Sequence, residues 1–151
     1  MIYISNNLAD TKKLANIIAA NATSGFILLK GPLAAGKTTF TKYLAKALDV
    51  KERVNSPTFV IMNQYLVNKK KYNLIHIDAY RLSSLEDVGM LTENFDNNLV
   101  VIEWYEKISD IIDSENILVL EWETISRHKR KVIILGKGIM FNHVIKALQG
   151  D

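Results

Sequence analysis

The residues with the clearest chemical pattern are Gly-Pro-Leu-Ala-Ala-Gly-Lys-Thr, from Gly31 to Thr38. Their spacing satisfies G-x-x-x-x-G-K-[ST], in which small residues let backbone N–H groups converge on phosphates at a helix N-terminus. Lys37 is expected to reach the β- and γ-phosphates of a nucleotide, and the Thr38 hydroxyl to bind Mg²⁺. A glycine turn before a helix is the alternative. The predicted nucleotide-binding residues are Leu33, Ala34, Ala35, Gly36, Lys37, Thr38 and Thr39.

The segments around this loop have the periodicity needed to position it. Residues 26–29 form a continuous apolar run between glycines, which is typical of a buried strand. Residues 8–22 and 38–48 have helical spacing on either side of it. The pattern then predicts strands at 58–67, 72–78, 99–104, 117–122 and 131–135, and helices at 85–91 and 142–148. A strand, a helix and then mostly strands predict an α/β fold with a mixed sheet.

Two of the predicted strands end in a carboxylate. Residues 73–77 are followed by Asp78, and residues 99–102 are followed by Glu103. A phosphoryl-transfer site needs carboxylates at strand ends to hold Mg²⁺ and orient water. Capping or surface carboxylates are the alternative interpretation. Glu121 ends a strand pattern of the same local form as the one before Glu103, so periodicity alone does not separate these two acids.

Three more motifs accompany the loop that runs from Gly31 to Thr39. They are Ser56-Pro57-Thr58-Phe59, His76-x-Asp78-x-Tyr80-Arg81-Leu82 and Glu103-Trp104. In this order and at this spacing, the four motifs resemble the TsaE family, the ATPases of bacterial threonylcarbamoyladenosine synthesis on tRNA. The resemblance covers residues 8–135, and the later three motifs make it specific, because many NTPases share the loop. It implies a single P-loop NTPase-like α/β domain over residues 1–151, with a mixed, partly antiparallel sheet flanked by helices.

The resemblance also implies roles for individual residues. It assigns Asp78 and Glu103 to the site. We take Glu103 as the Mg²⁺-side acid and Asp78 as the acid that orients water or Mg²⁺, and these two roles can be exchanged. Motif order favours Glu103 over Glu121, because Glu103 is the next strand end after the Asp78 motif. Thr58 lies in a switch-like segment near the γ-phosphate, for which a Ser-Pro turn is the alternative. The predicted catalytic residues are Lys37, Thr58, Asp78 and Glu103, and the predicted metal ligands are Thr38 and Glu103.

Three further residues keep two interpretations each, and a fourth departs from the family pattern. Arg81 is either an internal arginine finger or a member of an ordinary salt bridge. His76 belongs to the family motif, but a buried strand histidine explains it equally well. Trp104 belongs either to the core or to a partner surface. Ala34 stands where the family usually has glycine, so a positive φ at this position would strain the backbone and alter nucleotide affinity.

ATP is the expected nucleotide, because a guanine-specific Asn-Lys-x-Asp motif is absent and the family uses ATP. The leading hypothesis is slow Mg-ATP hydrolysis, stimulated by TsaB- and TsaD-like subunits that carry out the chemistry on tRNA. Contact between this chain and tRNA is then expected to be indirect. A small-molecule kinase and a non-catalytic, nucleotide-gated assembly module are the alternative functions.

The composition narrows the remaining possibilities. A length of 151 residues is typical of one domain with a real core. The absence of cysteine excludes disulfides, thiolate metal sites and a cysteine nucleophile. The longest uncharged stretch, residues 14–29, contains polar residues and a glycine, so no membrane span is expected and the predicted location is the cytoplasm. The basic runs Lys69-Lys70-Lys71 and Arg127-His128-Lys129-Arg130-Lys131 are predicted to be solvated hairpin tips or strand ends.

Overall fold

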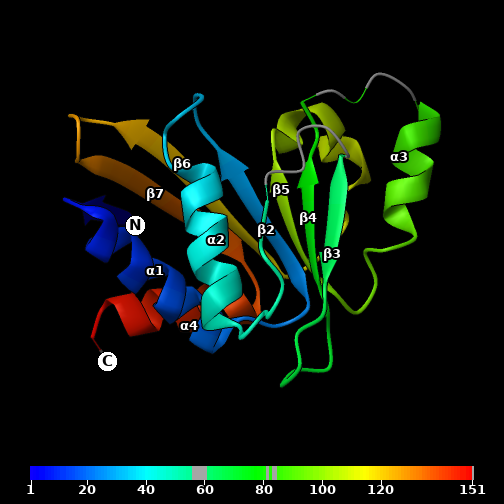
Figure 1. Ribbon diagram of the computed structural model, residues 1–151, viewed down its shortest axis with the longest axis horizontal. Helices are drawn as coiled ribbons and strands as arrows, with labels where there is room; N and C mark the ends of the chain where they lie inside the picture. Colours follow the sequence, from blue (N-terminus) through cyan, green and yellow to red (C-terminus); the bar gives the residue numbers. More distant parts are fainter. Residues whose placement is uncertain (56–60, 81, 83–84, 151) are drawn as a thin grey trace.

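The computed structural model describes residues 1–55, 61–80, 82 and 85–150. Within this part of the chain, seven strands form one sheet (Figure 1). The strands are β1 (Ile2–Ser5), β2 (Gly25–Lys30), β3 (Met62–Tyr65), β4 (Leu74–Asp78), β5 (Leu99–Glu103), β6 (Ile117–Thr124) and β7 (Arg130–Lys137). The helices are α1 (Leu8–Asn21), α2 (Lys37–Ala47), α3 (Leu85–Thr92), α4 (Ile139–Leu148) and the 3₁₀ helix η1 (Tyr105–Ile111).

The sheet is parallel in its centre and antiparallel at its sides. The strand order is β1-β7-β6-β2-β5-β4-β3. Strands β6, β2, β5 and β4 run parallel, whereas β1, β7 and β3 pair antiparallel with their neighbours. Because parallel strands point their carboxyl ends to the same edge, the loop after β2 and the ends of β4 and β5 meet there. The register places Asp78 directly beside Glu103.

Both faces of the sheet are covered by helices. Figure 1 shows α1, α2 and α4 gathered on one face, where they enclose the larger core cluster. Helices α3 and η1 contribute Leu91 and Ile108 to the second cluster, on the opposite face. Side chains of β2 alternate between the two, with Ile27 and Leu29 in the first and Phe26 and Leu28 in the second. This double burial explains why β2 has a continuous apolar sequence.

The N-terminus of α1 is fixed by its own polar residues. The Asn7 side chain accepts a hydrogen bond from the backbone N–H of Asp10 at 3.0 Å, which satisfies one unpaired donor of the first turn. The apolar positions Leu14 and Ile18 are fully buried against the sheet. The cap and the apolar stripe together hold the first turn of α1 at the same edge of the sheet as the loop after β2.

The predicted α/β fold with a mixed, partly antiparallel sheet is confirmed, but the sequence pattern does not predict β1 or η1. Strand β1 has four residues and depends on pairing with β7, in which Ile2 lies opposite Ile133. Helix η1 is a 3₁₀ helix with non-helical dihedral angles at Ile108, and such a helix does not need the 3.6-residue apolar spacing that predicts an α-helix. The predicted strand at 58–67 appears in its described part as Met62–Tyr65.

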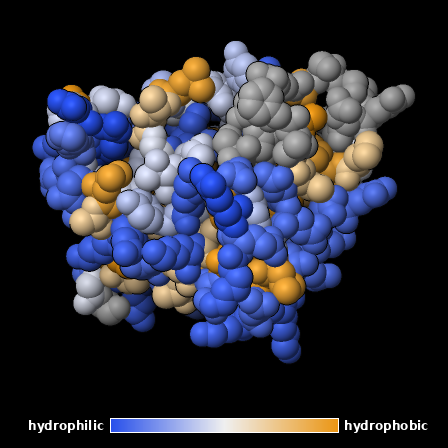
Figure 2. Space-filling model, viewed as in Figure 1, coloured by the Kyte–Doolittle hydropathy of each residue, from blue (hydrophilic) through white to orange (hydrophobic). Residues whose placement is uncertain are grey.

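The surface seen in Figure 2 is mainly hydrophilic, and its apolar side chains are scattered in small groups. The basic run Lys69-Lys70-Lys71 is exposed at the turn between β3 and β4, as predicted. In the described residues, no helix combines the length and the apolar character that crossing a membrane requires.

Candidate functional site

The loop between β2 and α2 has a backbone shape that small residues permit. Gly36 has φ 112°, in the region that favours glycine. A Cβ at Gly31 would lie 2.7 Å from the carbonyl oxygen of Trp122, so only glycine lets these two backbones approach so closely. Ala34 has φ 62°, the positive value at which an alanine is strained, as considered from the sequence. The loop then leads directly into α2, whose first residue is Lys37.

The Lys37 side chain folds back over the loop. It is 5% exposed, and its Nζ donates a hydrogen bond to the carbonyl oxygen of Gly31. Nζ also lies 4.1 Å from the centroid of the Trp104 ring, a cation–π contact. Burial lowers the pKa of Lys37, and the nearby carboxylates of Glu103, Glu106 and Asp78 oppose that shift. The ammonium is therefore held at the loop by groups that a phosphate could replace.

The acids at the ends of β4 and β5 lie next to the loop. The Thr38 hydroxyl donates to Oε1 of Glu103 at 3.3 Å, and Oε2 of Glu103 is 2.8 Å from Nε2 of His76. Asp78 is 8% exposed, and its Oδ1 accepts a hydrogen bond from the backbone N–H of Tyr80 at 3.0 Å. The structure thus brings together four predicted residues: Lys37, Thr38, Asp78 and Glu103.

The Thr38 and Glu103 oxygens are hard donors of the kind that Mg²⁺ binds. Their separation of 3.3 Å allows both to reach one cation. Among the described residues, no group of three or more His, Cys, Asp or Glu side chains is arranged to hold a metal. The remaining ligands would then come from phosphate oxygens and water, as is usual for Mg²⁺ in nucleotide sites.

Glu121 lies on the other face of the sheet. Its neighbours in β6, Leu120 and Trp122, belong to the cluster beneath α1 and α2. Successive strand residues point to opposite faces, so Glu121 points away from that cluster. Its charge acts instead on Tyr105, whose ring packs against the second cluster. The structure therefore places Glu103, and not Glu121, beside the loop.

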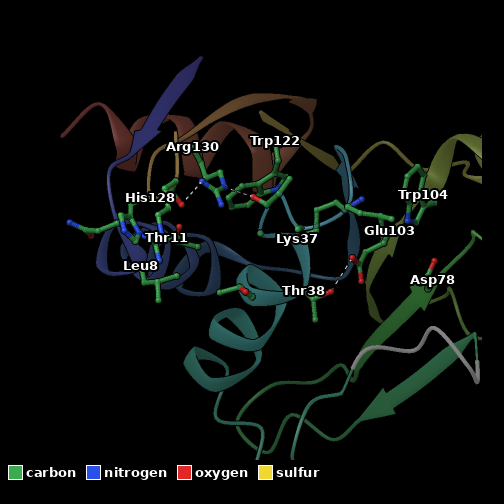
Figure 3. Close-up of a pocket in the computed structure, with 17 residues that line it drawn as sticks. Leu8, Thr11, Lys37, Thr38, Asp78, Glu103, Trp104, Trp122, His128 and Arg130 are labelled. Atoms are coloured by element: carbon green, nitrogen blue, oxygen red, sulfur yellow. Dashed lines mark hydrogen bonds between the residues drawn. The ribbon is translucent and has the colours of Figure 1, made fainter. Parts of the chain in front are cut away.

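A cavity of about 550 Å³ opens above the loop (Figure 3). Its lining includes six residues that the sequence pattern does not predict for the site: Asn7, Leu8, Thr11, Arg127, His128 and Arg130. The first three come from the start of α1, and the last three from the hairpin between β6 and β7. These side chains become neighbours of the loop only through the tertiary fold, which explains why no local motif identifies them.

Arg130 connects this hairpin to the loop. Its Nε donates to the carbonyl oxygen of Ala35 at 3.1 Å, and its Nη1 donates to the carbonyl oxygen of Ser126 at 2.8 Å. The interpretation of the run at 127–131 as solvated strand ends is therefore incomplete. Arg127 and His128 are exposed, yet they line the cavity, and Arg130 is half-buried. The sequence shows only a cluster of basic residues, and the geometry of the hairpin reveals that some of them face the cavity.

Trp104 lies between the loop and the outer surface. It has φ 60°, an uncommon value for an aromatic residue, and directly follows Glu103. One contact of its ring is with Nζ of Lys37, and another is with the ring of Tyr80, at a centroid distance of 5.1 Å. Tyr80 itself is 51% exposed. Trp104 thus packs against the second core cluster and also lines the cavity, and its role as a partner surface stays a prediction.

Two predicted residues lie outside the described part of the chain. Thr58 belongs to residues 56–60, and Arg81 is also excluded from the description. Their roles near a γ-phosphate stay predictions.

Comparison with known proteins identifies the family. The family model of the threonylcarbamoyl adenosine biosynthesis protein TsaE matches residues 5–132. The TsaE protein of Aquifex aeolicus is 43% identical over 131 residues, which are 85% of this chain and 90% of that protein. The Bacillus subtilis relative with the same name is 37% identical over 116 residues, covering 76% of this chain and 72% of its own length.

A solved structure supports the same conclusion. The crystal structure of Bacillus subtilis YdiB aligns with a TM-score of 0.77 at 26% identity, and the alignment covers 99% of this chain and 94% of that one. The resemblance inferred from the four motifs is confirmed by these matches. Because the family model spans the phosphate loop, both strand-end acids and strands β2 to β6, this chain belongs to the TsaE family of tRNA threonylcarbamoyladenosine biosynthesis proteins.

Proposed function

We propose that this chain is an ATPase that binds and hydrolyses Mg-ATP, and thereby supports partner subunits that make threonylcarbamoyladenosine on tRNA. The observation that carries the proposal is the grouping of Lys37, Thr38 and Glu103 at the mouth of the loop, with 3.3 Å between the hydroxyl and carboxylate oxygens. An ammonium, a hydroxyl and a strand-end carboxylate in this order are the groups that hold a nucleotide triphosphate and its Mg²⁺.

The triphosphate would lie along residues 33–39. Backbone N–H groups at the start of α2 point toward an anion there, and the helix dipole favours negative charge. Lys37 would exchange its hydrogen bond with Gly31 for bonds to the β- and γ-phosphates. The cost is small, because one charge-assisted hydrogen bond replaces another and the ammonium is already desolvated.

The base and ribose would extend toward α1 and the β6–β7 hairpin. That part of the cavity has an apolar wall at Leu8 and polar groups at Thr11 and His128 (Figure 3). A purine needs an apolar surface for its ring and a few polar groups for its edge. The Arg130 contact with Ala35 would keep this wall at a fixed distance from the phosphates.

Separate roles are proposed for the two acids and for Lys37. Thr38 and Glu103 would hold Mg²⁺, which when bound supplies positive charge to the phosphate oxygens. Asp78, paired with Glu103 in the register of β4 and β5, would orient the attacking water. Lys37 would stabilise the charge that develops on the γ-phosphate as its bond to the leaving group breaks. Thr58 and Arg81 are proposed to contact that phosphate.

Substitution of Lys37 tests the proposal. Lys37→Ala is expected to weaken Mg-ATP affinity by on the order of 10-fold or more, because it removes charged hydrogen bonds to the phosphates, and to abolish turnover. Titration calorimetry measures the affinity, and Lys42→Ala, an exposed position on the same helix, is the control. Equal ATP binding by Lys37→Ala and the parent would refute the assignment of the loop.

Radiolabelled γ-phosphate distinguishes this function from its two alternatives. An ATPase releases free phosphate, a small-molecule kinase transfers the label to an acceptor, and a nucleotide-gated assembly module does neither. The measurement is made with and without TsaB- and TsaD-like subunits, because the proposed ATPase is slow alone. No contact with tRNA through this chain is required by the proposal.

A further inference from the structure

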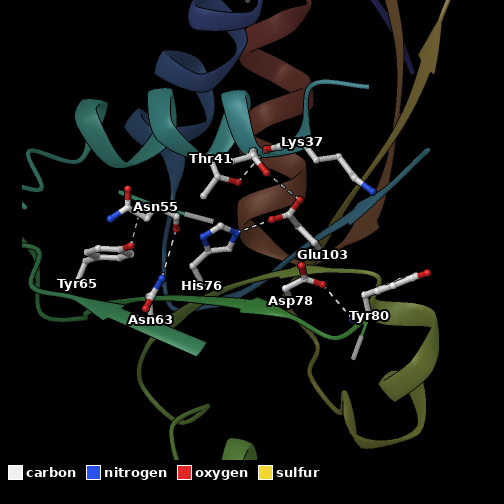
Figure 4. A network of polar contacts seen from close by, with 10 residues as sticks. Lys37, Thr41, Asn55, Asn63, Tyr65, His76, Asp78, Tyr80 and Glu103 are labelled. Carbon is white, nitrogen blue, oxygen red and sulfur yellow. Dashed lines mark hydrogen bonds and ion pairs between the residues drawn. The ribbon is translucent and has the colours of Figure 1, made fainter. Parts of the chain in front are cut away.

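His76 is a buried polar residue whose contact lies at the proposed site. It is in the middle of β4, is fully buried, and is two residues before Asp78, so both side chains lie on the same face of the sheet. Its Nε2 is 2.8 Å from Oε2 of Glu103, on the adjacent strand β5 (Figure 4). The contact therefore crosses from one parallel strand to the next, beneath the loop.

The hydrogen on the ring can be assigned from its partners. A carboxylate accepts hydrogen bonds, so Nε2 must carry the hydrogen and donate it to Glu103. Nδ1 has no hydrogen-bond partner among the described residues. A buried histidine with a purely structural role would be expected to form hydrogen bonds through both ring nitrogens. Here the hydrogen bond that the structure gives the ring is directed at the acid of the site.

Because of this hydrogen bond, the two carboxylate oxygens of Glu103 have different partners. Oε2 is occupied by His76, and Oε1 faces the Thr38 hydroxyl at 3.3 Å. The terminal torsion of a glutamate is broad, so a carboxylate without such a partner samples many orientations. Because Glu103 is 5% exposed, solvent offers few competing hydrogen bonds, and the hydrogen bond from His76 is correspondingly strong.

We propose that His76 is a positioning residue that fixes the carboxylate of Glu103, so that Oε1 is presented with Thr38 to the nucleotide-bound Mg²⁺. The inference rests on the proposed function. It predicts that loss of the Nε2–H donor weakens Mg²⁺ binding more than nucleotide binding, because Lys37 and the loop amides hold the phosphates independently of Glu103. Groups that hold a metal ligand in place affect metal affinity by about 10–100-fold in general.

The test compares two substitutions of His76. His76→Leu removes the donor, whereas His76→Gln keeps an N–H donor on a side chain of similar reach. Binding of a fluorescent ATP analogue is measured as Mg²⁺ is titrated, together with its affinity in EDTA. For His76→Leu, the Mg²⁺ concentration that gives half of the full increase in analogue affinity is expected to rise about 10-fold or more. The affinity for the analogue in EDTA is expected to stay unchanged. His76→Gln is expected to stay within about threefold of the parent in both measurements, as is the control His143→Leu on the exposed side of α4.

Two outcomes would overturn the positioning role of His76. The first is a parental Mg²⁺ dependence in His76→Leu. The second is an equal loss in the Gln and Leu variants, because that result would indicate packing and not the donor. If His76→Leu does not fold, as judged by circular dichroism, His76→Asn replaces it, since its shorter amide does not reach Glu103. A parent chain whose ATP binding ignores Mg²⁺ would refute the proposed function itself.

Discussion

Three ionisable side chains at the site are almost completely buried. Lys37, Asp78 and Glu103 are 5%, 8% and 5% exposed. Removing charges from water costs several kcal/mol for each ion, in general, unless partners compensate. Here Glu103 has Thr38 and His76 as partners, while Lys37 has Gly31 and the ring of Trp104. Such a cluster is an inefficient way to stabilise a fold, so its cost points to a binding role.

Ala34 is a second residue whose conformation is costly. An L-residue at φ 62° loses about 1–2 kcal/mol relative to a right-handed conformation. Glycine would relieve this strain but add about 0.5–1 kcal/mol of chain entropy to the unfolded state. We therefore expect Ala34→Gly to raise the free energy of unfolding by roughly 0.5–1 kcal/mol, measured by urea denaturation.

The control for this substitution is Asn97→Gly. Asn97 has the same φ of 62°, but asparagine tolerates the left-handed region, so its replacement should change stability less than that of Ala34. A less stable Ala34→Gly chain would mean that the alanine methyl group makes a compensating contact.

The residues of the site differ in how far the sequence predicts them. Lys37 and Thr38 belong to one contiguous motif, so their proximity follows from local chemistry. Asp78 and Glu103 are predicted because each ends an apolar strand. His128 and Leu8 are not predicted, because they reach the cavity from elements that are distant in the sequence. Their position depends on the pairing of β6 with β2 and on the packing of α1, which no short pattern encodes.

At the scale of elements, the face of the sheet on which a strand residue lies decides whether Glu103 or Glu121 can reach the phosphate loop. In β5, Glu103 is two residues after Val101 and so lies on the same face of the sheet, beneath α1 and α2. In β6, Glu121 is next to Trp122, which lies on that face, and so Glu121 lies on the opposite one. A shift of one residue moves a side chain to the other face of a sheet. Local sequence around Glu103 and Glu121 is nearly identical, so they are separated by the order of the motifs and by the packing of helices on one face, and not by local pattern.

This difference in phase gives a direct prediction. Glu103→Gln is expected to lower Mg²⁺-dependent ATP turnover by on the order of 10²-fold or more, because it removes charge from the metal side of the site. Glu121→Gln preserves that side and should keep the parental rate within about threefold. Steady-state phosphate release measures both variants. Reversed effects would show that the acid of β6 is the one that acts.

The elements that the sequence predicts best are those with local causes. Strand β2 is buried on both faces and α2 begins at the end of the glycine loop, so both have clear patterns. Strand β1 and η1 have no such pattern, since the first is held by β7 and the second contains a kink at Ile108. Their existence follows from tertiary pairing and from the chain turn after Trp104, where φ is positive.

At the scale of the whole molecule, acidic residues are concentrated in one part of the chain. Residues 82–126 contain eleven acidic residues and one basic residue, Lys107, although the complete chain has a net charge of +3. This segment includes α3, β5, η1 and β6, and its residues Glu103, Trp104 and Trp122 line the cavity. A segment with such an excess of one charge favours a partner of the opposite sign and makes association faster at low ionic strength. A TsaB- or TsaD-like subunit that docks here would thus be expected to present a basic surface.

The cavity itself is open to solvent. Leu33, in the phosphate loop, is 80% exposed, and Leu8, at the start of α1, is 64% exposed; both line the cavity. These exposed apolar side chains beside the phosphate loop would be removed from water if a second protein covered the cavity. Trp104, for which a partner surface is one of the two interpretations, also lines this cavity. The Lys69-Lys70-Lys71 turn precedes β4, and so lies at the end of that strand opposite Asp78.

We therefore expect slow ATP turnover by the isolated chain and a marked increase when the partner subunits are added. Water at an open site competes with the dipoles that stabilise charge on the transferring phosphate, and a protein that covers Leu33 and Leu8 excludes it. Steady-state phosphate release with and without the subunits measures the increase. Leu33→Ser should reduce the stimulation more than it reduces the slow basal rate, because its side chain points into solvent in the isolated chain. An isolated chain that is already fast, and indifferent to the subunits, would instead identify a self-sufficient ATPase or a kinase.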